Sequence, residues 1–239
     1  MKNILLLMMG GSGSRLGAEV PKQYLEVNGH PIFYYIVREY VYLNEISTIC
    51  VVSHPDWLEY VSEVTSDLND YCTIRIVSGG KNRSESVLHG LRAVRDIASA
   101  EDIVLIHDAT HPYVDKVGTM AVLEAARKYG GATLGACQYD TCYQIDGHSN
   151  LTQVIPRHEV VSGASPEAFR FGDISSIYFQ STREELEKMT SAGAIALAHH
   201  IPMKVIPAQT LNLKITYPED LKLFRLLVHS YFFKNTEGD

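Results

Sequence analysis

The hydrophobic pattern of the chain begins with an unbroken apolar run, Ile4 to Met9. A short run without polar alternation is typical of a strand that is buried on both faces. Apolar residues at helical spacing follow from Pro31 to Leu43, and a β-branched run from Ile46 to Ser53 predicts a second strand. Strand, helix and strand in this order form the βαβ unit of a parallel sheet, so we expect an α/β fold.

The same alternation continues through the first half of the chain. The further predicted elements are a helix over Pro55–Leu68, a strand over Thr73–Val77, a helix over Arg83–Val94, a strand over Asp102–Ile106, and a helix opened by Pro112 and Asp115 that ends near Lys128.

From Ala132 onward, short segments of alternating polarity replace this pattern, with the turn sequence Asp146-Gly147-His148-Ser149-Asn150 between them. They predict a β-hairpin arm over about residues 136–157, inserted into the α/β alternation. Because so small an arm cannot bury its own faces, we expect it to pack against a second copy of the chain in a homodimer.

Beyond the arm, the α/β pattern returns. The predicted elements are a helix over Asp173–Met189, a strand over Lys204–Pro207, a short extended run over Asn212–Thr216, and a last helix opened by a capping box at Thr216-Tyr217-Pro218-Glu219. The apolar face of that last helix would contain Leu221, Phe224, Leu227, Val228 and Tyr231.

Length and composition narrow the class of protein. The 239 residues, 46% hydrophobic and 21% charged, fit one globular domain with a proper core. The longest apolar run is too short to span a bilayer and no small-residue cleavage site follows it, so we expect a cytoplasmic protein without membrane attachment. The net charge of −7 argues against a nucleic-acid partner, which needs a basic face. A few local cations must therefore hold any anionic ligand.

Cysteine and histidine give no sign of a metal centre. The four cysteines form no C-x-x-C pair, and we expect Cys50, Cys72, Cys137 and Cys142 to be buried free thiols. The ten histidines show no H-E-x-x-H or similar ligand spacing.

A glycine-rich loop, GGSGSRLG, follows the first strand. Gly10, Gly11 and Gly13 allow a sharp turn and let backbone N–H groups approach a ligand such as phosphate. The P-loop is excluded because no Gly-Lys-Ser/Thr occurs. The dinucleotide fingerprint G-x-G-x-x-G fits poorly as well, because the third glycine, Gly17, stands one position too late.

The pattern that remains is G-x-G-x-R-[LM]-G followed by P-K-Q, the signature of nucleotidyltransferases. In it, Arg15 and Lys22 add fixed positive charges to the triphosphate cradle. A plain turn is the alternative for a lone glycine loop, but this spacing of Arg15, Pro21, Lys22 and Gln23 favours the functional interpretation.

Two further strand ends carry candidate ligand groups. Paired glycines, Gly79 and Gly80, end the third strand, and Arg83 opens the next helix at the sheet edge where α/β proteins bind ligands. Hydroxyl groups in the same helical turn, from Ser84 and Ser86, are either ligand contacts or ordinary caps. Asp108, just past the fourth strand, is a candidate Mg²⁺ ligand, with a turn or helix cap as the alternative.

The chain resembles a family, the cytidylyltransferases that act on 2-C-methyl-D-erythritol 4-phosphate in isoprenoid synthesis, with close relatives that act on ribitol 5-phosphate in teichoic acid and glycan synthesis. The blocks that carry the resemblance are GGSGSRLG, PKQY, GGKNRSESV, HDATHP, YDT, PRHEVVSGASPEAF and NLKITYPEDL, in this order. It covers almost the whole chain. It implies one Rossmann-like domain over residues 1–239, a three-layer α/β/α sandwich with a mostly parallel sheet and a protruding β-hairpin arm.

The resemblance also implies roles for particular residues. Catalytic cations that hold the α-phosphate would be Arg15, Lys22 and Lys214. Nucleotide-binding positions would be Met9, Gly10, Gly11, Gly13, Gly80, Arg83 and Ser86. Asp108 would hold Mg²⁺ and the ribose, and the second substrate would be bound by Asp140, Thr141, Arg157 and Ser165, partly across the dimer. The implied ligands are CTP, Mg²⁺ and a polyol phosphate.

This chain departs from the family pattern at three places. His111 replaces the arginine of H-D-A-x-R-P, Ser165-Pro166-Glu167 replaces T-P-Q, and Thr190-Ser191-Ala192-Gly193 replaces a Thr-Asp-[DE]-Ala segment. The triphosphate half is intact, so the departures bear on the acceptor. Other functions that stay open are transfer to another sugar phosphate and nucleotide binding without catalysis.

Overall fold

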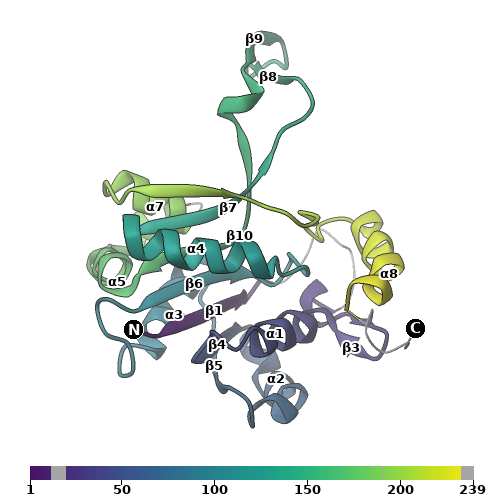
Figure 1. Ribbon diagram of the computed structural model, residues 1–239, viewed down its shortest axis with the longest axis vertical. Coiled ribbons are helices and arrows are strands. Elements are labelled where there is room, and N and C mark those ends of the chain that lie inside the picture. The colour runs from purple at the N-terminus through teal and green to yellow at the C-terminus, as the bar shows by residue number, and fades with distance from the viewer. Residues whose placement is uncertain (12–19, 190, 233–239) are drawn as a thin grey trace.

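A seven-stranded sheet runs through the centre of the protein (Figure 1). The computed structural model describes residues 1–11, 20–189 and 191–232. The strand order is β11-β7-β10-β6-β1-β4-β5, and only β10 runs antiparallel to its neighbours. The strands are β1 (Asn3–Met9), β4 (Thr48–Ser53), β5 (Thr73–Ser78), β6 (Ile103–Asp108), β7 (Gly131–Cys137), β10 (Val161–Arg170) and β11 (Met203–Pro207). The predicted mostly parallel sheet is confirmed.

Helices cover both faces of this sheet. On one face lie α1 (Ile32–Leu43), α2 (Leu58–Val64) and α4 (Lys116–Tyr129), and on the other lie α3 (Arg83–Ala93), α5 (Phe171–Gln180), α6 (Arg183–Lys188) and α7 (Ala192–Ala198). Alternate residues of β1 enter two separate cores: Leu5 and Leu7 pack in the first, and Ile4 and Leu6 in the second. Coverage on both faces explains the unbroken apolar sequence of this strand.

A third apolar cluster holds the last helix, α8 (Pro218–Phe232), against the β2–β3 hairpin (Figure 1). The two short strands are β2 (Glu26–Val27) and β3 (His30–Pro31). The predicted apolar face of α8 is confirmed, because Leu221, Phe224 and Val228 are buried there. Leu213 and Ile215 from the preceding segment join the cluster, so the cluster also fixes the course of residues 211–217.

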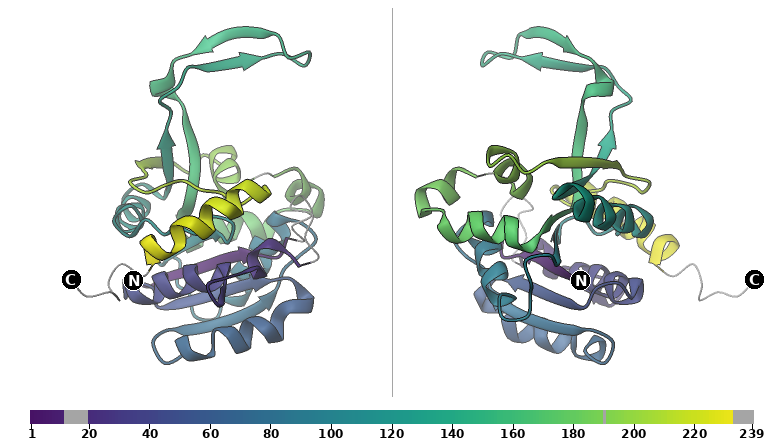
Figure 2. Two further views of the ribbon diagram at one scale, coloured as in Figure 1. Left: turned by 90° about the vertical axis from the view of Figure 1, so that its right-hand side faces the viewer. Right: turned by 60° about the vertical axis from the view of Figure 1, so that its left-hand side comes forward.

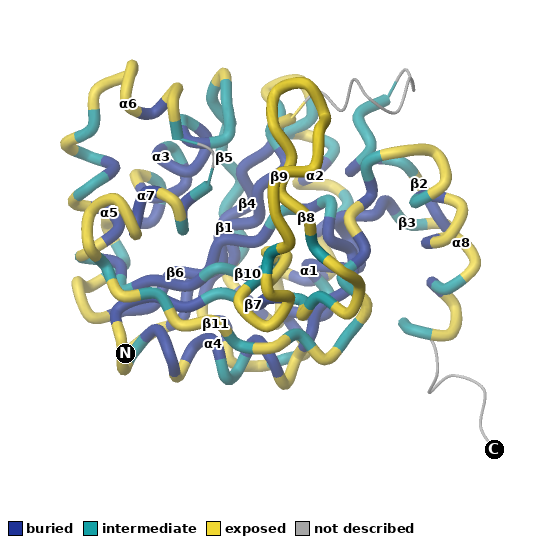
Figure 3. The backbone as a smooth tube through the Cα atoms, turned by 90° about the horizontal axis from the view of Figure 1, so that it is seen from above, coloured by how far each residue is buried: buried dark blue, intermediate teal, exposed yellow. Residues whose placement is uncertain are grey.

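The predicted hairpin arm forms and stands away from the sheet (Figures 1 and 2). Its strands β8 (Cys142–Ile145) and β9 (Leu151–Ile155) pair antiparallel, and β7 and β10 lead into them. Seen from above, the arm is almost wholly exposed (Figure 3). Tyr139, Leu151 and Val154 expose 84%, 66% and 62% of their surface, which is unusual for apolar side chains that have no covering element.

Short 3₁₀ helices complete the described secondary structure. They span Lys22–Tyr24, Pro55–Trp57, Ser66–Leu68 and Arg157–Glu159. Of the helices within the described residues, none is long and apolar enough to cross a membrane.

The structure corrects the predicted helix over Asp173–Met189, which is two helices, α5 and α6. The break lies at Thr182, whose side chain accepts from the backbone N–H of Glu185 while the Glu185 carboxylate accepts from the N–H of Thr182. This reciprocal capping box starts a new helix inside the predicted one. Helix α7, a short run of mainly small residues, was not predicted.

The extended run expected over residues 212–216 joins none of the described sheets, and the N–H of Ile215 donates to Thr110 O. Two more expectations were wrong. Asp220, not Glu219, accepts from the backbone at the start of α8, through the N–H groups of Thr216 and Tyr217. Cys137 and Cys142 lie on the arm, exposed and half-buried respectively, whereas Cys50 and Cys72 are buried as expected.

Asp115 fastens the C-terminal segment to the sheet. It is 3% exposed and caps α4, which begins at Lys116 rather than at Pro112, by accepting from the N–H of Gly118 at 2.8 Å. Its second oxygen accepts from the N–H of Gln209 at 2.6 Å, just past β11. The segment that carries Lys214 is therefore held at both of its ends.

Candidate active site

Two glycine turns meet where the parallel strands end. Gly10 follows β1 and Gly79 follows β5, and the N–H of Gly79 donates to Ser53 O at the end of β4. A Cβ atom on Gly79 would lie 3.3 Å from the Cα of Gly10 and 3.1 Å from Ser86 Oγ. Only residues without side chains pack this closely, so the two turns form one continuous backbone surface at this edge.

Gln23 and Tyr24 hold the first turn in place. The amide nitrogen of Gln23 donates to Met9 O and to Gly11 O, both at 2.7 Å, and the side chain is 3% exposed. The Tyr24 hydroxyl also reaches Met9 O, and its ring stacks on Trp57 with centroids 4.3 Å apart. The P-K-Q motif thus supplies a support for the loop as well as a lysine.

Gly13 and Arg15 fall within residues 12–19, which lie outside the described part of the chain. Their roles in the phosphate cradle and in catalysis stay predictions.

The second turn is organised by Asn82 and Ser86 at the start of α3. Asn82 caps the helix by accepting from the N–H of Glu85. Ser86 Oγ accepts from the N–H of Gly80 at 3.0 Å and donates to Asn82 O at 2.8 Å. Asn82 is therefore the cap, a role left open for Ser84 and Ser86. Ser84 instead donates to Met189 O, which ties α3 to the segment after α6.

Asp108, at the end of β6, lies among cations. Arg83 Nε and Nη2 each lie 3.0 Å from Asp108 Oδ1, and Lys214 Nζ lies 3.9 Å from Oδ2. Burial alone would raise the pKa of Asp108, but the charges of Arg83 and Lys214 outweigh it and hold the pKa below its ordinary value. The carboxylate is therefore ionised at neutral pH.

Lys22 and Lys214 converge from distant parts of the sequence. Lys22 Nζ donates to Ile215 O at 2.7 Å, one residue from Lys214. The side chain of Lys214 is 52% exposed and faces Asp108, so it is not a remote surface lysine. Two of the three predicted catalytic cations thus lie on adjoining parts of one site.

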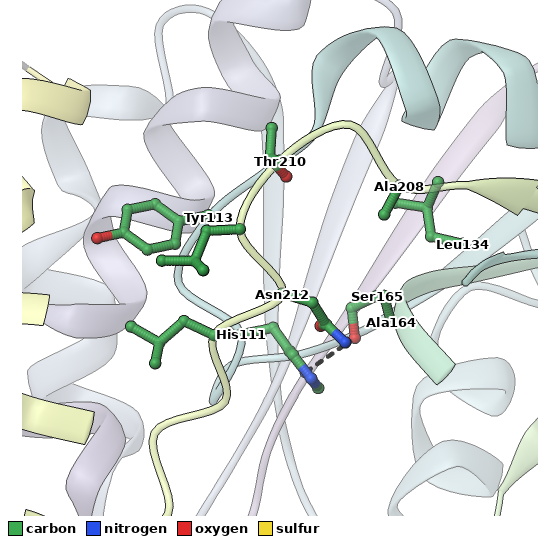
Figure 4. A pocket seen from close by; sticks show the side chains of 10 residues that line it. His111, Tyr113, Leu134, Ala164, Ser165, Ala208, Thr210 and Asn212 are labelled. Atoms are coloured by element: carbon green, nitrogen blue, oxygen red, sulfur yellow. Dashed lines mark hydrogen bonds between the residues drawn. The ribbon is translucent and has the colours of Figure 1, made fainter. Parts of the chain in front are cut away.

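Ser165 and His111 form the adjoining wall. Ser165 Oγ accepts from the N–H of Asp108 at 3.3 Å and lies 3.2 Å from His111 Nδ1. Figure 4 shows these two side chains at a cavity of about 10 Å³, room for about one water, which Tyr113 and Asn212 also line. Burial, together with the charges of His107 and Lys214, lowers the pKa of His111 to about 3, so its imidazole is neutral. A neutral ring stands where the family pattern has an arginine.

The three arm residues predicted to bind the second substrate lie elsewhere. Asp140 and Thr141 are exposed, and Arg157 donates to Tyr139 O at 2.7 Å at the base of the arm. Within the described residues, no hydrogen bond or ion pair links them to the cluster around Asp108. By contrast, the structure gathers Met9, Gly10, Gly11, Lys22, Gly80, Arg83, Ser86, Asp108, Ser165 and Lys214 at one sheet edge.

Asp108 is the residue at this edge that could bind Mg²⁺. Among the described residues, no three possible ligands cluster together. Asp108 offers one carboxylate whose Oδ2 is beyond hydrogen-bond distance of Lys214. Because Mg²⁺ often takes one carboxylate, substrate phosphates and several waters, this single group fits the ion.

Sequence reasoning missed the loop support by Gln23 and Tyr24, and it marked Glu167 as a departure from the family pattern without giving its partners. Glu167 Oε2 lies 3.5 Å from Arg83 Nη2, and Oε1 accepts from the N–H of Gly193. Burial raises the pKa of Glu167, while the charge of Arg83 opposes the rise. Its replacement of glutamine was the available signal.

Backbone donors, fixed cations and an acidic residue at the carboxyl edge of a parallel sheet define an α/β nucleotidyltransferase. The family model described as 2-C-methyl-D-erythritol 4-phosphate cytidylyltransferase, IspD, matches residues 4–230. The chain belongs to this family of cytidylyltransferase enzymes, as its motifs predicted.

Individual relatives agree with this assignment. A 2-C-methyl-D-erythritol 4-phosphate cytidylyltransferase of Clostridium botulinum is 30% identical over 224 residues, 94% of this chain and 98% of that protein. A ribitol-5-phosphate cytidylyltransferase of Streptococcus agalactiae is 25% identical over 228 residues, 95% of each chain. The solved 4-diphosphocytidyl-2C-methyl-D-erythritol synthase of Anaerococcus prevotii has a TM-score of 0.81 at 23% identity, covering 95% of this chain and 96% of that one. This likeness confirms the fold.

We expect Gln23→Met to lower the free energy of unfolding by about 1–3 kcal/mol, because the buried carbonyl of Met9 keeps only its longer hydrogen bond from Tyr24 and Gly11 O loses its side-chain donor. Guanidinium chloride unfolding measures this change. Gln180→Met, at an exposed position, is the matched control. Equal stabilities of the two variants would contradict a supporting role for Gln23.

Proposed function

We propose that this enzyme transfers CMP from CTP to a small polyol phosphate, either 2-C-methyl-D-erythritol 4-phosphate or ribitol 5-phosphate. The products are a CDP-polyol and pyrophosphate. The observation that carries this proposal is that Arg83 and Lys214 both face Asp108, while Lys22 binds Ile215 O next to Lys214, beside two bare-backbone turns. Relatives of both acceptor types match the chain over nearly its whole length, so either polyol is a candidate.

The chemistry needs cations more than a base. A phosphate oxygen of the acceptor attacks the α-phosphorus of CTP, a new P–O bond forms, and the bond to pyrophosphate breaks. The acceptor phosphate is already ionised at neutral pH, so no side chain has to remove a proton. The encounter joins two anions, so catalysis consists of in-line positioning and charge neutralisation. Lys22 and Lys214, with Arg15 as predicted from the sequence, would supply that charge.

Mg²⁺ is part of this proposal, with Asp108 as its protein ligand. Bound there, the ion would neutralise charge on the triphosphate. The remaining coordination would come from phosphates and water, consistent with the single carboxylate at this edge.

A homodimer through the arm would complete the acceptor site. The arm exposes several apolar side chains and also carries Asp140, Thr141 and Arg157. Among the described residues, no hydrogen bond or ion pair joins these three to the Asp108 cluster of their own chain. An arm that reaches a partner would both cover its apolar face and deliver these polar groups. We also propose a cytoplasmic location.

The departure at His111 favours a second candidate, transfer of a nucleotidyl group to a different sugar phosphate. A neutral imidazole in place of a guanidinium weakens recognition of an anionic group at this wall.

A substrate panel tests the function. We expect CTP with Mg²⁺ to raise the melting temperature more than UTP, GTP or ATP, because a ligand that binds only the folded state stabilises it. Pyrophosphate release is expected with methylerythritol or ribitol phosphate. No release with either, despite CTP binding, would support the other sugar phosphates, and no CTP binding would refute the proposal.

Lys22→Ala separates binding from turnover. We expect the affinity for CTP to change by only a few fold and turnover to fall by roughly 10²-fold, since a charge that acts mainly in the transition state is lost. Lys222→Ala, at an exposed position of α8, is the control. Equal losses in affinity and turnover would make Lys22 a ground-state contact instead.

Leu151→Asp tests the arm as a dimer interface. Placing a charge on this apolar surface should convert a dimer to monomer in light-scattering chromatography and reduce transfer to the acceptor while CTP still binds. Leu226→Asp makes the same change at a site that is 78% exposed on α8 and should leave the dimer intact. A monomeric wild-type protein with full activity would contradict the dimer.

A further inference from the structure

Glu167 lies deep beside the nucleotide site, on β10. Its side chain is 16% exposed, and the regular pairing of β10 with β7 is interrupted just before it, between Ala164 and Glu167. Such irregularities re-aim side chains next to functional sites. Oε1 accepts from the N–H of Gly193 at 2.8 Å, and a Cβ on Gly193 would lie 2.6 Å from that oxygen. The absence of a side chain at Gly193 therefore makes room for the carboxylate.

The guanidinium of Arg83 lies between two carboxylates. Both of its short contacts, from Nε and Nη2, go to a single oxygen of Asp108. Glu167 Oε2 lies 3.5 Å from Nη2, close enough for an ion pair but without a hydrogen bond. A small movement of the guanidinium toward Glu167 would turn this ion pair into a hydrogen bond.

Arg83 and Glu167 each have one side-chain atom without a hydrogen bond among the described residues, and so does Tyr178. Arg83 Nη1, Glu167 Oε2 and the Tyr178 hydroxyl are buried and make no hydrogen bond within the described part of the chain. Burial raises the pKa of Tyr178, while the charge of Arg83 lowers it and the charge of Glu167 raises it. Buried polar atoms without partners are costly. A second arrangement, in which the Arg83 guanidinium donates to Glu167 Oε2, would give that oxygen a partner.

Arg83 and a bound cation would compete for the carboxylate of Asp108. Under the proposed function, its carboxylate binds a cation that accompanies the triphosphate, yet Arg83 occupies one oxygen and Lys214 faces the other. A cation at Asp108 would repel the guanidinium. Arg83 needs another anionic partner at that moment, and Glu167 is the other carboxylate within ion-pair distance of it among the described residues.

We propose that Glu167 is a positioning residue that takes over the guanidinium of Arg83 when CTP and its cation engage Asp108. This inference rests on the proposed function. Glutamine, as in the family pattern, supplies no negative charge at this position. In this chain, residues 191–193 also lack the acidic side chains of the family segment. The carboxylate beside Arg83 is thus supplied from β10.

Glu167→Gln tests the charge while keeping the shape. The amide oxygen of glutamine still accepts from the N–H of Gly193, so a purely structural role predicts unchanged behaviour. If Glu167 instead binds Arg83 in the CTP complex, Glu167→Gln should bind CTP about tenfold more weakly than wild type in MgCl₂, which corresponds to the loss of one charge-assisted hydrogen bond. With EDTA in place of MgCl₂, the difference between variant and wild type should shrink to about twofold or less, because the competing cation is gone.

Calorimetric titration with CTP measures both affinities. Because its stoichiometry reports the folded fraction, partial unfolding of the variant does not obscure the dissociation constant. Glu187→Gln, an exposed glutamate paired with Arg183 on α6, is the matched control. Equal CTP affinity of Glu167→Gln and wild type in MgCl₂, or an equal loss with and without the ion, would overturn the inference. Failure of the wild type to bind CTP would instead refute the proposed function.

Discussion

The hydrogen bond from Lys22 Nζ to Ile215 O connects the two parts of the chain that build the site, 193 positions apart. On one side of it, Gln23 and the first glycine turn are fixed by contacts within the N-terminal segment. On the other side, Ile215 is held by Thr110, and its neighbour Lys214 faces Asp108. The distance between the two lysines therefore depends on this bond, and under the proposed function charge neutralisation depends on that distance.

The fold could be predicted where local pattern and burial agree. The unbroken apolar run of β1 gives its strand because helices cover both faces of the sheet. The pattern failed where a local cap or a distant partner decided the structure. Thr182 and Glu185 end one helix and begin another inside a continuous helical periodicity. The pattern also gave no partner for the extended run at Ile215, whose N–H is engaged by Thr110.

The site residues could also be predicted only in part. Glycines, cations and Asp108 lie at positions that a motif can mark, since strand ends of a parallel sheet share one edge. The role of Glu167 was not predictable, because its partners Arg83 and Gly193 are 84 and 26 positions away. Nor could periodicity distinguish Lys214 from an ordinary exposed lysine. Lys214 faces the carboxylate of Asp108, which also pairs with Arg83. Without a bound anion, the negative charges of Asp108 and Glu167 offset the repulsion between these two cations.

Helix α8 rests on its own apolar cluster with the β2–β3 hairpin, apart from the two cores of the sheet. This has a consequence for the order in which a nascent chain acquires its parts. At about 5–20 residues per second, a ribosome needs roughly ten seconds or more to travel from Lys22 to Ile215. The first glycine turn emerges early and Lys214 late. A growing polypeptide can thus fold around its first core before the two lysines are brought together.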